Sequence, residues 1–179
     1  MEEKRDARGL TEAEAIARYR SRNYPKPALT ADIVVLSRTE AGLKVLLVER
    51  GGHPFIGALA LPGGFANENE PIEETAAREL AEETGVEGLS MKLVGVFSRP
   101  GRDPRGWVVS AAFAAVVDTD RLTVQAGDDA ASARWYAIET TNGRLTLRNG
   151  DTSLPAEELA FDHGSVLARA LEQIGRAHV

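Results

Sequence analysis

The stretch that decides the fold is residues 64–86, GFANENEPIEETAARELAEETGV. Its centre predicts a helix over residues 71–84, because proline suits the first helical turn and Gly85 stands just beyond the last one. One face of this segment repeats an apolar residue every four positions, as a buried stripe does: Ile72, Ala76 and Leu80. We therefore expect a packed helix between two glycine-marked ends.

The same segment carries three carboxylates outside that stripe, on Glu79, Glu82 and Glu83. At about 100° per residue they fall within roughly a third of the helix circumference. Like charges at this spacing repel by roughly 0.2–0.5 kcal/mol. A divalent cation would remove that repulsion, so a metal site of oxygen ligands is the leading interpretation. The alternative is an ordinary solvated helix face.

Composition limits the class of protein. The chain has 179 residues, 43% apolar and 27% charged, which suits one soluble domain. Its net charge of −6 argues against general nucleic-acid binding. It contains no cysteine, which excludes disulfides and thiolate chemistry. The first residues are charged and no run approaches the ~20 apolar residues of a membrane span, so we expect a cytoplasmic protein.

The remaining pattern predicts more strands than helices. A short helix at 11–20 has Thr11 as N-cap and Glu14 as its capping-box partner. Residues 30–37 and 43–50 predict a hairpin, and 162–174 predict a closing helix. Three further strands are expected at 91–98, 107–117 and 133–138. These elements favour an α+β fold, a mixed β-sheet with flanking helices, in a domain of residues 28–179 after an extension of residues 1–27.

Read as spacing, residues 64–86 place Gly64, Glu70 and the run RELAEETGV at 78–86 in the pattern of the Nudix box. Every defined position of that pattern matches, so the chain resembles the Nudix hydrolases. The lead-in ALPGGF at 60–65 and GRDPRGW at 101–107 resemble the ADP-ribose pyrophosphatase branch of that family. The resemblance covers roughly residues 28–138 and implies an α/β/α sandwich.

The resemblance also implies a chemistry and a ligand set. Nudix enzymes hydrolyse a nucleoside diphosphate linked to a group X, using Mg²⁺ or, as a substitute, Mn²⁺. By position, Glu79 and Glu83 would be the principal metal ligands, Glu82 would assist, and the Gly63 carbonyl would complete the coordination. Catalysis would then rest on Glu82 and Glu83. Arg78 and Glu70 match positions that orient the glutamates.

Candidates for the substrate side lie outside the box. Arg102, Asp103 and Arg105 sit in a loop between two strands, where an arginine would contact phosphate or the group would form a salt-bridged turn. Arg50, at a strand end, is a second phosphate candidate or a plain surface arginine. Phe65 is a candidate for stacking on a base.

A general base is expected from a later loop, at Asp129 or its neighbour Asp128, although turn and capping roles would explain both aspartates equally well. Together these features predict Mg²⁺-dependent hydrolysis of ADP-ribose to AMP and ribose 5-phosphate. The alternatives are a pyrophosphatase for NADH, a nucleoside triphosphate or a dinucleoside polyphosphate, and a non-catalytic ADP-ribose sensor. The expected partner is a small nucleotide, with neither nucleic acid nor membrane, and family analogy implies a homodimer.

Overall fold

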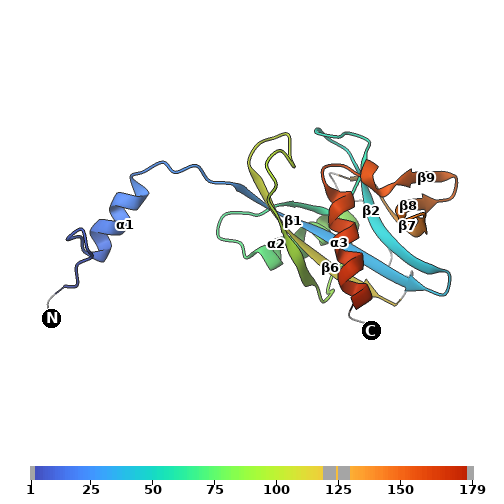
Figure 1. Cartoon of the computed structure of the whole chain (residues 1–179), viewed down its shortest axis with the longest axis horizontal. Helices are drawn as coiled ribbons and strands as arrows, with labels where there is room; N and C mark the ends of the chain where they lie inside the picture. Colours follow the sequence, from blue (N-terminus) through green and yellow to red (C-terminus); the bar gives the residue numbers. More distant parts are fainter. Residues whose placement is uncertain (1–2, 119–123, 125–129, 177–179) are drawn as a thin grey trace.

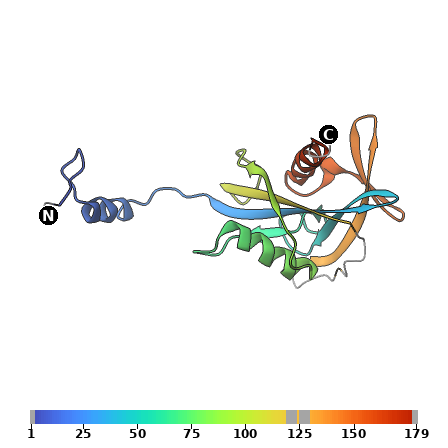
Figure 2. The same cartoon turned by 90° about the horizontal axis from the view of Figure 1, so that it is seen from below.

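The computed structural model describes residues 3–118, 124 and 130–176. In these residues a mixed β-sheet lies between two helices, α2 (Ile72–Thr84) and α3 (His163–Arg176), as Figures 1 and 2 show. The predicted mixed sheet with flanking helices is therefore confirmed. None of the described helices is long and apolar enough to cross a membrane.

Within the described residues the sheet contains nine strands, most of them joined in the order β5-β6-β1-β2-β7-β8-β9, while β3 pairs with β2 and β4 with β1. Among these strand pairs only β1 and β6 run parallel, and the others are antiparallel. The strands in chain order are β1 (Ala28–Thr39), β2 (Gly42–Arg50), β3 (Leu59–Ala60), β4 (Gly63–Phe65), β5 (Lys92–Phe97), β6 (Val108–Val117), β7 (Ala130–Thr141), β8 (Arg144–Asn149) and β9 (Thr152–Pro155).

Strand β1 is the centre of the sheet and is buried on both faces. Because side chains alternate along a strand, Ile33 and Val35 pack toward α2, in a cluster with Ala76 and Leu80. Their neighbours Val34 and Leu36 pack on the other face, in a cluster with Val166 and Leu167 of α3. This double burial explains why the middle of β1, residues 33–36, is apolar at every position.

The predicted hairpin at 30–37 and 43–50 is confirmed as β1 and β2, which pair antiparallel with Thr39 opposite Gly42. The predicted helix at 71–84 is also confirmed, with Pro71 at its N-cap. The β8–β9 hairpin and a 3₁₀ turn, η1 (Ala156–Glu158), were not predicted.

Helix α1 (Glu12–Arg20) begins as the sequence predicts. The Glu14 amide donates to the Thr11 hydroxyl at 3.2 Å, and the Thr11 amide donates to the Glu14 carboxylate at 2.8 Å. No residue of α1 is buried, and Figure 1 shows it standing away from the sheet. The helix therefore adds nothing to the site described below.

Candidate active site

The position of α2 is fixed by its buried face and by its C-terminal end. The face against the sheet consists of Thr75, Ala76, Leu80 and Thr84. At the end, Gly85 has a φ of 70°, and its amide donates to the Ala81 carbonyl at 2.8 Å. A left-handed residue is common just after a helix, and glycine adopts it without strain.

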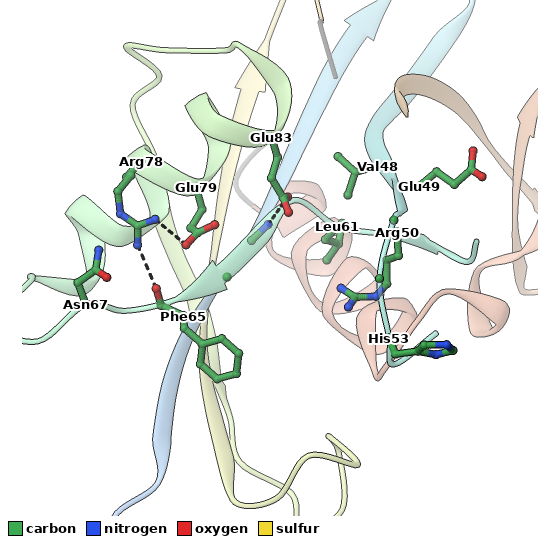
Figure 3. A pocket seen from close by; sticks show the side chains of 14 residues that line it. Val48, Glu49, Arg50, His53, Leu61, Phe65, Asn67, Arg78, Glu79 and Glu83 are labelled. Carbon is green, nitrogen blue, oxygen red and sulfur yellow. Dashed lines mark hydrogen bonds and ion pairs between the residues drawn. The ribbon is translucent and has the colours of Figure 1, made fainter. Parts of the chain in front are cut away.

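A cavity of about 530 Å³ lies beside α2 and is drawn in Figure 3. Glu79 and Glu83 line it from α2, Arg50 from the end of β2, and Gly63 and Phe65 from β4. Figure 3 shows the Arg50 side chain facing the two carboxylates across this space. One wall is therefore acidic, and the opposite wall carries the positively charged Arg50 guanidinium.

Two glycines bring the backbone of β4 against these carboxylates. The Gly63 amide donates to Glu83 Oε2 at 2.9 Å. At Gly64, an added Cβ would lie 2.4 Å from the Glu79 carboxylate, whereas at Gly63 it would lie 2.1 Å from the Ala31 carbonyl oxygen. The first obstacle is the end of a flexible side chain and the second is fixed backbone.

This difference predicts opposite outcomes for two alanine substitutions. Gly64→Ala should displace the Glu79 carboxylate and lower kcat by about 10- to 100-fold, the usual effect of misplacing a catalytic group. Its free energy of unfolding should stay within about 1 kcal/mol of wild type. Gly63→Ala, at a φ of 153°, should instead lower the free energy of unfolding by about 1–3 kcal/mol. Urea titrations and steady-state rates measure both; an unchanged kcat in Gly64→Ala would contradict this account of Glu79.

Arg78 joins the acidic residues into one network. Its Nε donates to Glu70 at 2.8 Å, and one terminal nitrogen donates to Glu79 at 2.7 Å and to Glu82 at 2.9 Å. The other terminal nitrogen donates to the Phe65 carbonyl at 3.0 Å. The Arg78 hydrogen bonds, with those from Asn67 and Thr75, lower the pKa of Glu70 to about 2. The predicted pairing of Arg78 with Glu70 is confirmed.

The donor set at this wall is suited to a hard cation. Across residues 3–118, 124 and 130–176, no group of three His, Asp or Glu side chains has the mutual spacing that would hold a metal ion. Glu79 and Glu83 nevertheless face one cavity beside the Gly63 backbone, and oxygen-only ligands suit Mg²⁺. Burial raises the pKa of the Glu79 carboxyl, against the opposing effect of Arg78, and a cation would relieve that cost. Glu82 does not line the cavity, and its side chain is 58% exposed.

Arg102, a predicted phosphate contact, lies in a buried ionic cluster. It donates to the Asp162 carboxylate at 3.0 and 2.6 Å and to Asp32 at 3.2 Å. The Ser110 hydroxyl also donates to Asp32, at 2.6 Å. The Arg102 side chain is 3% exposed. This geometry favours the salt-bridge alternative for Arg102, whose contact with a substrate stays a prediction.

Asp103 and Arg105 form a second pair in the same loop. The Asp103 carboxylate accepts hydrogen bonds from the Arg105 amide at 2.8 Å and from the guanidinium at 2.7–3.2 Å. Burial alone would raise the pKa of Asp103, but the Arg105 bonds and the Arg102 charge outweigh it and lower the pKa. Asp103 is buried, whereas the Arg105 side chain is 39% exposed. Asp103 thus fixes the loop, and Arg105 is left at the surface of the site.

His163 connects this ionic cluster to Leu61, which lies between β3 and β4. Its Nδ1 accepts a hydrogen bond from the Leu61 amide at 2.9 Å, and its Nε2 lies 3.6 Å from Asp32. Burial lowers the His163 pKa, against the nearby Asp32 charge. Because Nδ1 accepts the Leu61 amide, it carries no proton in this arrangement. Sequence reasoning did not assign Asp32 or His163. The only signal was Asp32 itself, a single carboxylate within an apolar strand.

The predicted site residues that the structure describes fall into three groups: those lining the cavity, those lining a recess beside it, and Glu82. One cavity brings together five of them: Arg50, Gly63, Phe65, Glu79 and Glu83. An adjoining recess of about 60 Å³ is lined by Arg102, Asp103 and Arg105, and shares Arg50, Gly63 and Phe65 with the cavity. Glu82 lines neither the cavity nor the recess, and its carboxylate accepts a hydrogen bond from Arg78. Asp128 and Asp129 lie outside the described residues, so the general base stays a prediction.

Comparison with known proteins agrees with this geometry. The sequence model of the NUDIX domain matches residues 26–155. The chain is 35% identical to an ADP-ribose pyrophosphatase of Methanocaldococcus jannaschii, over 92% of this chain and 83% of that protein. It is 29% identical to the ADPR responsive transcriptional repressor NtrR of Acinetobacter baylyi, over 89% of this chain but only 59% of the repressor.

A solved structure is similar over nearly the same span. The NUDIX domain of Shewanella oneidensis NrtR, complexed with ADP ribose, superposes with a TM-score of 0.73 and 31% identity, over 92% of this chain and 99% of that domain. Fold, site and sequence therefore agree that the chain belongs to the NUDIX family. Within that family it is a Nudix hydrolase that resembles the ADP-ribose pyrophosphatase branch, as the sequence predicted.

Proposed function

We propose that this Nudix hydrolase cleaves ADP-ribose to AMP and ribose 5-phosphate and depends on Mg²⁺. The observation that carries the proposal is the division of the cavity into an acidic wall, Glu79 and Glu83, and a wall that carries Arg50. A pyrophosphate between the two walls would meet a cation held by the carboxylates on one side and the Arg50 guanidinium on the other. The volume of about 530 Å³ falls in the range of small-ligand pockets.

Each wall has its own task in this proposal. Glu79 and Glu83, with the Gly63 carbonyl, would hold the cation, and Arg78 keeps Glu79 and Glu82 oriented. The bound metal would neutralise pyrophosphate oxygens and activate the attacking water. Arg50 would contact the phosphates, since its guanidinium offers several donors. Glu82 would assist from outside the cavity, and Asp129 stays the proposed base.

The choice of ADP-ribose rests on likeness. The pyrophosphatase of M. jannaschii and the ADP-ribose complex of S. oneidensis NrtR both support it. Phe65, 41% exposed at the cavity, offers a ring for the adenine or for another base. A homodimer, by family analogy, and a cytoplasmic location, from the sequence composition, stay part of the proposal.

A second candidate is an ADP-ribose sensor without turnover, because a transcriptional repressor is among the similar proteins. The two acidic side chains at the cavity favour the enzyme, since a sensor would not need a metal-activated water.

A nucleotide panel separates the candidates. ADP-ribose, NADH, a nucleoside triphosphate and a dinucleoside polyphosphate are each incubated with Mg²⁺, and AMP and phosphate release are followed. We expect the highest kcat/KM for ADP-ribose. A higher kcat/KM for another nucleotide of the panel would identify that nucleotide as the substrate instead.

A further inference from the structure

Four separate segments bring aromatic rings and guanidinium groups together at the edge of the site. Arg105 Cζ lies 4.6 Å from the ring centroid of Phe65 and 5.3 Å from that of Phe161. Arg50 Cζ lies 4.9 Å from the Phe161 centroid. We call Phe65, Arg105, Phe161 and Arg50 the Phe161 stack. Phe161 is half-buried between η1 and α3, and among the described aromatic rings it alone lies within cation–π distance of both arginines.

The backbone holds Phe161 in an unfavourable conformation. Its φ is 56°, in the left-handed region that a bulky side chain rarely adopts because the backbone is strained there. The preceding residue is anchored, because the Ala160 amide donates to the Leu59 carbonyl at 2.8 Å. Phe55, which packs edge-on against Phe161 with centroids 4.9 Å apart, also has a positive φ, 62°. The contacts of the Phe161 ring must offset this backbone cost.

The charges in the stack are not internally balanced. Arg105 is paired with Asp103. Arg50 donates from Nε to the Pro54 carbonyl at 2.8 Å, and no carboxylate among the described residues hydrogen-bonds to it. Burial lowers the pKa of Arg50, and the positive charge of Arg105 lowers it further, against the smaller opposing effects of the Glu83 and Asp103 charges. Two guanidinium groups near one ring repel each other, and an anion between them and the acidic wall would remove that repulsion.

We propose that Phe161 is a positioning residue that holds Arg50 and Arg105 toward the phosphate groups of the substrate. Arg50 and Phe65 line both the cavity and the recess, so the stack faces the space in which a pyrophosphate would lie. Cation–π contacts hold each guanidinium beside its ring. Arg105 already donates to Asp103 from Nε and Nη2, so Arg105 Nη1 and the terminal nitrogens of Arg50 are the donors that would reach a phosphate. The inference rests on the proposed function for the identity of the ligand but does not require turnover.

The test measures binding of ADP-ribose in EDTA, because removing metal leaves the arginines as the principal phosphate contacts. Phe161→Leu should raise the Kd about 5- to 30-fold, the loss expected for two cation–π contacts. Phe161→Tyr keeps the ring and should restore the wild-type Kd. Phe97→Leu, the same change at a half-buried core position outside the site, controls for lost packing and should leave the Kd unchanged. With Mg²⁺, Phe161→Leu should raise KM while kcat stays near wild type.

A double-mutant cycle tests whether Phe161 acts through the arginines. In an Arg50→Met, Arg105→Met background, Phe161→Leu should change the Kd less than about twofold, since no cation is left to position. An equal loss in both backgrounds would overturn the inference, as would an unchanged Kd for Phe161→Leu alone. If wild type binds ADP-ribose without cleaving it, the proposed function fails while the binding comparison still decides this inference. If wild type binds neither ADP-ribose nor inorganic pyrophosphate, the inference is overturned as well.

Discussion

Glu83→Gln is expected to lower kcat for ADP-ribose by at least about a thousandfold, roughly 4 kcal/mol of transition-state stabilisation. Glutamine has the size of glutamate, and its carbonyl oxygen can still accept from the Gly63 amide as Glu83 does now. Only the negative charge is lost, and with it the ability to hold a divalent cation. Steady-state rates at saturating Mg²⁺, with thermal melts to show an intact fold, measure this effect.

Glu74→Gln is the matched control on the same helix. Glu74 is exposed in the first turn of α2 and contributes only to the helix end, so its rates should equal those of wild type. Near-wild-type turnover by Glu83→Gln at saturating Mg²⁺ would contradict the assignment of Glu83 as a metal ligand.

Arg102→Met is expected to lower the free energy of unfolding by about 3–5 kcal/mol. The substitution removes the cation that Asp32 and Asp162 share and leaves two buried carboxylates uncompensated. The midpoint of urea unfolding measures this loss. Where the variant is folded, KM for the substrate should stay near wild type, because Arg102 already has its partners.

Arg144→Met provides the comparison for a surface ion pair. Arg144 pairs with Glu157 where both side chains are more than half exposed, so solvent screens the pair and Arg144→Met should leave the urea midpoint close to that of wild type. A stable Arg102→Met variant with a strongly raised KM would reverse the interpretation and return Arg102 to the substrate side.

The parts of the fold that the sequence predicted are those with strong local patterns. β1 contains the apolar run at 33–36, and α2 combines a four-residue repeat with Pro71 and Gly85 at its ends. The β8–β9 hairpin was missed although Gly150-Asp151, the two residues between the paired Asn149 and Thr152, are common in hairpin turns. Its strands are short and lie at the edge of the sheet, so burial imposes little pattern on them.

Within the site, the residues fixed by helix spacing were predictable and those fixed by long-range pairing were not. Glu79 and Glu83 reach one cavity because they lie one turn apart on α2. Arg102 was open to two interpretations because its partner Asp162 lies 60 residues away. Phe161 was missed for the same reason: its two arginines come from the end of β2 and from the loop before β6, both far away in the sequence. Sequence spacing carries no information about such contacts.

The measurement that tests the central claim most directly is product analysis after wild-type protein is incubated with ADP-ribose, once with Mg²⁺ and once with EDTA. The account predicts AMP and ribose 5-phosphate in equal amounts with Mg²⁺, and intact ADP-ribose with EDTA. Binding of ADP-ribose without either product, across Mg²⁺ and Mn²⁺ concentrations, would contradict it and would support the sensor instead.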